Sequence, residues 1–121
     1  MKAKVIEKQW PMSLYDIIRF QINTHCFLNS IRISPAQLDT LAYLGMWGDM
    51  NISDFCEQIA AEEIFGTPQT VRNFVTKCVK DKLIYKKGMG KKIISLSDDF
   101  KLINNGTILI NMKVYHVDKE Q

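Results

Sequence analysis

The sequence predicts a mainly α-helical domain with a small β-hairpin, an α+β fold. Two segments carry apolar residues on one helical face, at spacings of three and four residues, and a short glycine-containing turn separates them. After Asp81 the pattern becomes that of strands, because β-type runs at 83–85 and 93–96 flank a turn at 87–91 with two glycines. A chain of 121 residues is long enough for one core, so we expect a single domain over residues 1–121.

Capping residues mark the start of four predicted helices. Each start has a serine or threonine whose side chain can accept a hydrogen bond from a free amide of the first turn. The expected N-caps are Ser13, Ser34, Ser53 and Thr67. Pro35 and Pro68 stand at first helical positions, and Gln37 completes a capping box in the second helix. The first helix is expected over about 13–28, and the glycines at 45–48 mark the end of the second.

The two ends of the chain have weaker, β-type patterns. Residues 2–9 alternate loosely and predict a short edge strand, while residues 107–117 predict another strand or a tail that pairs with the N-terminus. No apolar run approaches the roughly 18–20 residues that cross a bilayer, and residues 1–12 lack the apolar region of a signal peptide. Three widely spaced cysteines fit reduced thiols, so we expect a cytoplasmic protein that does not bind a membrane.

The positive charge of the chain is concentrated in one region. The net charge is only +3, yet residues 72–92 hold eight basic side chains against a single acid. Residues 1–71 and 93–121 are each net negative. Such a concentration indicates a surface that meets a polyanion.

The order of these elements resembles the winged helix-turn-helix fold of MarR-like and related small transcriptional regulators. SPAQLDTLAYL is similar to their second helix, NISDFCEQIA to the helix that opens the motif, and TPQTVRNFVTKCVKDKLIYKK to the recognition helix leading into the wing. The resemblance covers residues 34–97. It implies a helix-turn-helix at about 53–81 and a wing at about 83–97, with extensions at 1–12 and 98–121. It also implies double-stranded DNA as the partner and no enzymatic activity.

The predicted DNA-binding face is the polar side of the helix that begins at Thr67, together with the lysines of the hairpin. In docked helix-turn-helix proteins the early residues of the second helix reach base edges, where Gln, Asn and Arg side chains can make paired hydrogen bonds. The expected base contacts are Gln69, Thr70, Arg72 and Asn73. The expected phosphate contacts are Thr67, Thr76, Lys77, Lys80, Lys86, Lys87, Lys91 and Lys92.

The sequence shows no pattern typical of catalysis, of a metal site or of a cofactor, so we expect none of these. His25 and His116 are isolated from each other, and His25 and Cys26 point to different faces of their helix. The glycines at 88–90 lie in a hairpin turn with no helix after them, unlike a phosphate-binding loop. Residues 98–99 are expected in a turn, or as the cap of a short helical piece, rather than as an acid–base pair.

A protein–protein interaction module is the alternative, because folds of this kind are reused as assembly subunits, for example in viral or mobile-element complexes. Glu62 and Glu63 lie in the lengthened turn between the third and fourth helices, where a phosphate backbone would be repelled. Phe20, Phe27 and Leu28 lie off the main apolar stripe of the first helix and could form a docking surface. The partner would be another protein in a larger assembly, and a homodimer is also open.

Overall fold

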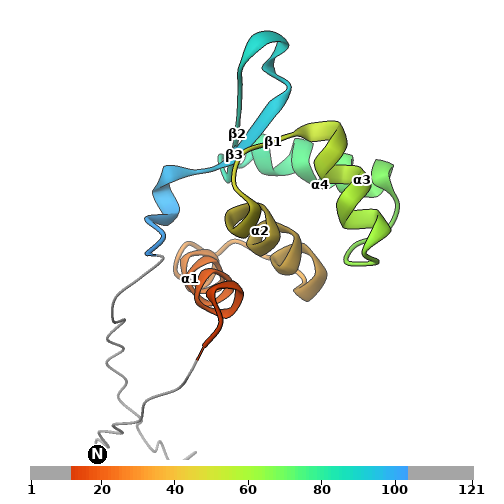
Figure 1. Ribbon diagram of the computed structural model, residues 1–121. Helices are drawn as coiled ribbons and strands as arrows, with labels where there is room; N and C mark the ends of the chain where they lie inside the picture. The colour runs from red at the N-terminus through yellow and green to blue at the C-terminus, as the bar shows by residue number, and fades with distance from the viewer. Residues whose placement is uncertain (1–11, 104–121) are drawn as a thin grey trace, which may run out of the picture.

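The computed structural model describes residues 12–103, which form four α-helices and a small antiparallel sheet (Figure 1). The helices are α1 (Leu14–Leu28), α2 (Pro35–Trp47), α3 (Ile52–Ala61) and α4 (Pro68–Lys80). The strands are β1 (Met50–Asn51), β2 (Ile84–Lys87) and β3 (Ile93–Leu96), with β3 in the centre of the sheet. Two short 3-10 turns are η1 (Met89–Lys91) and η2 (Asp98–Phe100). The strands expected at 2–9 and 107–117 lie outside the described residues.

Three of the four expected N-caps are confirmed, and one is wrong. Ser13, Ser34 and Thr67 each accept a hydrogen bond from a backbone amide in the first turn, and Gln37 completes the capping box of α2. The α3 helix is instead capped by Asn51, whose side-chain oxygen accepts from the amide of Ser53 at 2.8 Å. The pairing of Asn51 with Ile93 in the sheet holds its backbone extended, so the helix begins at the very next residue.

The end of α2 falls within residues 45–48, as expected. The helix continues through Gly45 to Trp47, and only Gly48, with φ at 85°, ends it. Gly45 has a packing role, because a Cβ atom there would lie 2.8 Å from Leu96 Cδ1 and 2.9 Å from Ile18 Cγ2. The missing side chain therefore lets α2 approach both α1 and β3 closely.

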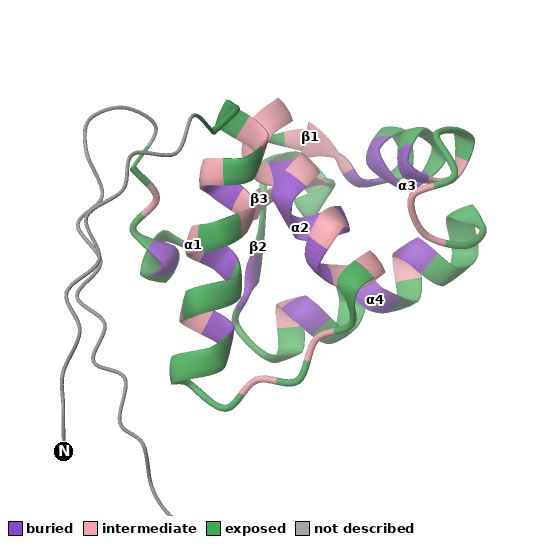
Figure 2. Cartoon of the chain, turned by 90° about the horizontal axis from the view of Figure 1, so that it is seen from below, coloured by how far each residue is buried: buried purple, intermediate pink, exposed green. Residues whose placement is uncertain are grey.

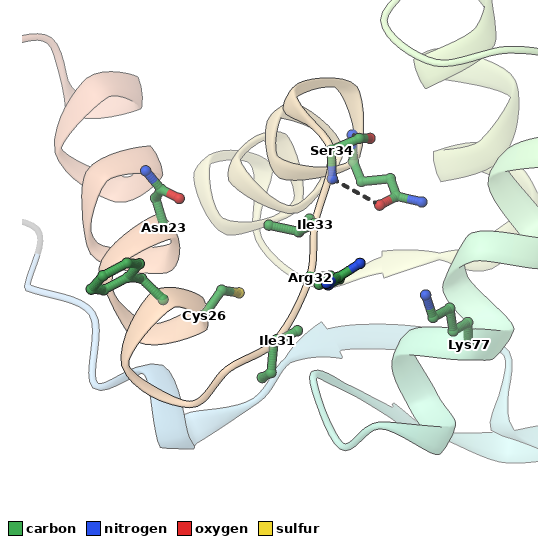
Figure 3. Close-up of a pocket in the computed structure, with 9 residues that line it drawn as sticks. Asn23, Cys26, Ile31, Arg32, Ile33, Ser34 and Lys77 are labelled. Carbon is green, nitrogen blue, oxygen red and sulfur yellow. Dashed lines mark hydrogen bonds between the residues drawn. The ribbon is translucent and has the colours of Figure 1, made fainter. Parts of the chain in front are cut away.

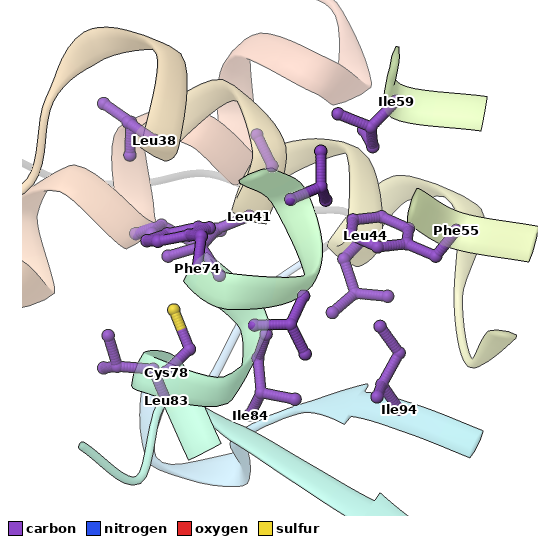
Figure 4. Close-up of a cluster of buried hydrophobic side chains, with 14 of the residues drawn as sticks. Leu38, Leu41, Leu44, Phe55, Ile59, Phe74, Cys78, Leu83, Ile84 and Ile94 are labelled. Atoms are coloured by element: carbon purple, nitrogen blue, oxygen red, sulfur yellow. The ribbon is translucent and has the colours of Figure 1, made fainter. Parts of the chain in front are cut away.

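The core lies where α2 meets the other elements. Figure 2 shows buried residues of α1 and α2 turned toward the interior, and Figure 4 shows side chains from α2, α3, α4 and the sheet in one cluster. Its most deeply buried large side chains are Ile18, Ile22, Leu41, Leu44, Phe55, Ile59, Ile84 and Ile94. Because every helix contributes to this cluster, burial of apolar surface fixes the position of α4 and the side of it that faces solvent.

The three cysteines, Cys26, Cys56 and Cys78, are free thiols buried in this core. Burial raises the pKa of each, and that of Cys78 reaches about 12. Since the thiolate is the reactive form, we expect no reaction of the folded protein with a thiol reagent such as DTNB at pH 8. All three should react once urea unfolds the chain. Rapid labelling of the folded protein would contradict this packing.

Candidate nucleic-acid interface

The α4 helix divides into a buried apolar side and an exposed polar side, as the residue pattern predicts. Val71, Phe74, Val75 and Cys78 are buried against the core. The side chains on the opposite side are exposed, and they are Gln69, Asn73, Thr76, Lys77 and Lys80. The structure therefore leaves this polar side of α4 open to a ligand.

Hydrogen bonds within the first turns of α4 orient the polar side chains. The Gln69 side-chain amide donates to the Asn73 side-chain oxygen at 2.8 Å, one helical turn away. This pairing leaves the Gln69 oxygen as an acceptor and the Asn73 NH₂ group as a donor, the two functions that an adenine edge needs. The hydroxyls of Thr67 and Thr70 lie 3.0 Å apart, and Thr67 also caps the helix.

Arg72 lies at the border of this surface rather than at its centre. Its side chain is half-buried, and one guanidinium nitrogen donates to the Ser53 hydroxyl at 2.9 Å. Ser53 belongs to the first turn of α3, so the contact links α3 to α4. The remaining guanidinium donors of Arg72 make no hydrogen bond within the described part of the chain.

The lysines of the β2–β3 hairpin are all exposed, but they are not equivalent. Lys86, Lys91 and Lys92 make no ion pair with any residue of 12–103. Lys87 instead forms a salt bridge with Asp49, which precedes β1. The Lys87 ammonium and the Ser95 hydroxyl hold the pKa of Asp49 below its usual value. Three of the four expected phosphate contacts of the hairpin are therefore unpaired cations, and one is neutralised.

The sequence did not reveal the partner of Lys87. Asp49 meets the hairpin because β1 pairs with β3, and β3 in turn pairs with β2. A two-residue strand has no recognisable alternation, so neither β1 nor this ion pair could be read from the residue pattern.

An open groove borders the polar side of α4 at Lys77. Its volume is about 610 Å³, and its walls come from α1, the 29–34 loop, the start of α2, and α4. The lining residues are Asn23, Cys26, Phe27, Ile31, Arg32, Ile33, Ser34, Gln37 and Lys77. Figure 3 shows Arg32 and Lys77 on the side of the groove away from α1. With two cations and no carboxylate, this lining is positive. Arg32 was not among the expected contacts, since it stands alone in sequence and only the fold places it near α4.

The described residues show no built catalytic or metal site. Within 12–103, no three His, Cys, Asp or Glu side chains come together as they would around a metal ion. His25 packs edge-on against Phe100, with ring centroids 4.6 Å apart, and His116 lies outside the described residues. Residues 98–99 belong to the η2 turn, which Ser97 caps.

No helix in the described part of the chain has the length and hydropathy to span a bilayer. Comparison of the chain with protein-family models, with curated proteins and with solved structures gives no match.

Proposed function

We propose that this protein is a winged helix-turn-helix DNA-binding protein, a small non-enzymatic transcriptional regulator. In this proposal α4 enters the major groove of duplex DNA, and the β2–β3 hairpin is the wing that lies along the phosphates. The order of helices and strands, with a helix pair followed by an antiparallel hairpin, supports this assignment.

The observation that carries the proposal is the shared exposure of two chemically different sets of side chains. The polar side of α4 offers amide and hydroxyl groups suited to base edges, chiefly Gln69 and Asn73. The exposed lysines that are suited to phosphates and make no ion pair within 12–103 include Lys77, Lys80, Lys86, Lys91 and Lys92. With both sets exposed, α4 could contact base edges while the lysines of the hairpin contact the phosphates of the same duplex.

Fluorescence anisotropy with random-sequence duplex DNA over a series of salt concentrations tests the proposal. We expect micromolar or tighter binding at low salt, and a slope of about −4 to −5 in the plot of log K against log salt for five phosphate contacts. Absence of binding at low salt would overturn the DNA assignment.

A role as a protein–protein assembly subunit is the second candidate function, and one observation favours it. Phe27 is 81% exposed and Leu28 is 73% exposed on α1, far more than large apolar side chains usually are on a monomer. In that case DNA would not bind, and the α1 surface would hold a protein partner.

If the proposal holds, breaking the Asp49–Lys87 pair should raise the affinity for DNA. Changing Asp49 to Asn removes the acid that pairs with the hairpin and frees Lys87 for a phosphate. We expect affinity to rise by up to about eightfold at roughly 0.1 M salt, and the salt slope to steepen by about one unit. The pair is solvent-exposed, so its loss should cost less than about 1 kcal/mol of stability.

Glu57→Gln, at an exposed position of α3, is the matched control for Asp49→Asn, because it makes the same change in net charge. If both variants tighten binding equally, the gain reflects net charge alone and Lys87 does not contact DNA.

A further inference from the structure

The open groove beside α4, which we call the Arg32 groove, holds two cations without a counter-ion. Arg32 and Lys77 both line it, and both side chains are exposed. Neither makes an ion pair within 12–103, and no carboxylate belongs to the lining. Figure 3 shows Arg32 beside Lys77, on the side of the groove away from α1. Like charges that lie together without an acid create a positive potential, which attracts an anion.

These cations lie on one flank of α4, and the hairpin lies on the other. Lys77 and Arg72 are five positions apart, so their side chains leave the helix about 140° apart, on either side of its outward polar residues. Arg72 bonds to Ser53 at the start of α3, where the Ile52 amide donates to the Lys92 oxygen of the hairpin at 2.8 Å. The hairpin therefore meets the Arg72 flank, and the Arg32 groove meets the opposite flank at Lys77.

This arrangement matches the two walls of a DNA major groove. A helix with its side chains is about 10–12 Å wide, and the major groove of B-DNA is about 12 Å wide. A helix that fills the major groove therefore has phosphates along both of its flanks. The lysines of the hairpin can serve one row of phosphates, and the cations of the Arg32 groove lie where the other row would pass.

We propose that Arg32, together with Lys77, binds the phosphate backbone on the flank of α4 opposite the hairpin, so that a DNA duplex is held from both sides. This inference rests on the proposed function and adds Arg32 to the contacts given there. The planar guanidinium of arginine can donate two parallel hydrogen bonds to one phosphate. Such a contact carries no sequence information, but it fixes the position of α4 against the bases.

A grip on both flanks of α4 favours a DNA duplex over an RNA duplex. The major groove of A-form RNA is deep and narrow, so side chains cannot read it. An RNA duplex would therefore meet the lysines of the protein without placing its two rows of phosphates along the two flanks of α4. We expect Arg32 to contribute to the binding of DNA and to contribute little to the binding of RNA.

Anisotropy titrations of Arg32→Gln against random-sequence duplex DNA test the contact. We expect an affinity about eightfold lower than that of the wild type at about 0.1 M salt, and a salt slope shallower by about 0.9 units. Arg32→Lys keeps the charge, so its slope should stay close to that of the wild type. Arg32 is exposed, so melting curves should show the same melting temperature for all three proteins.

Lys101→Gln is the matched control for Arg32→Gln. Lys101 is exposed, follows η2 and lies outside the lining of the Arg32 groove, and its substitution makes the same change in net charge. We expect Lys101→Gln to bind DNA with the slope of the wild type. If the two variants lose affinity and slope equally, Arg32 acts only through net charge, and the second phosphate contact is overturned.

The outcomes separate this inference from the proposed function. If the wild type does not bind duplex DNA at low salt, the proposed function fails, and this inference fails with it. If the wild type binds DNA and Arg32→Gln binds it equally well, only the contact at Arg32 is overturned. An RNA duplex of the same sequence is the last arm of the test. A loss of affinity for RNA as large as that for DNA would show that Arg32 does not bind the wall of a B-form major groove.

Discussion

Changing Lys86, Lys91 and Lys92 to glutamine should weaken binding to random-sequence duplex DNA by a few hundredfold at about 0.1 M salt. Each lost phosphate contact removes about 0.9 units of log–log salt slope, which is a factor of about eight at that concentration. These three hairpin lysines are exposed and unpaired within 12–103, whereas Lys87 is left unchanged because Asp49 neutralises it. Anisotropy titrations at several salt concentrations measure both the affinity and the slope.

The control for this triple variant changes Lys2, Lys4 and Lys8 to glutamine. It has the same net charge as the hairpin variant but keeps the cationic region of residues 72–92 intact. We expect it to bind nearly as tightly as the wild type, with little change in slope. If the two triple variants lose affinity equally, DNA responds to overall charge and the hairpin is not a phosphate-binding wing.

The helices could be predicted from the sequence because their signals are local. A cap, a proline at the first position and a one-face apolar spacing all lie within a few residues, as in the segment that starts at Thr67. The hairpin was equally readable, since two glycines stand between two β-type runs and adopt positive φ.

The errors in the predicted fold have one origin, which is long-range pairing. The β1 strand exists because Met50 and Asn51 pair with β3, more than forty positions along the chain. That pairing moved the cap of α3 from Ser53 to Asn51. In the same way, the close packing of Gly45 against distant Leu96 could not be predicted from the sequence. A single sequence contains no trace of such partners.

The candidate site, like the fold, was predicted from the sequence only where the signals are local. Which residues of α4 are exposed follows from helical periodicity, and the structure confirms the exposure of Gln69, Asn73 and Lys77. Which polar groups are already engaged depends on neighbouring elements, so the Arg72–Ser53 and Lys87–Asp49 contacts were not foreseen. Sequence therefore predicts the surface, and the structure identifies which of its charges are available.

The position of α4 depends on the packing of the core, and a substitution at Phe55 is the strongest test of that dependence. Phe55 is 0% exposed on α3 and lies edge-on to Trp47 of α2, with ring centroids 6.0 Å apart. Phe55→Ala removes most of the ring and leaves a cavity between the helices. We expect a loss of about 3–5 kcal/mol in the free energy of unfolding. Since small domains have only about 5–15 kcal/mol in total, this variant should be close to unfolding.

Urea denaturation followed by far-UV circular dichroism measures this loss. Phe55→Leu should cost less than Phe55→Ala, because leucine fills part of the cavity. The exposed control Met89→Ala should stay within about 0.5 kcal/mol of the wild type. If Phe55→Ala matched Met89→Ala, Phe55 would not be buried between α2 and α3. The α4 helix would then lack the fixed support that a base-reading helix needs, because its neighbour α3 would not be packed against α2.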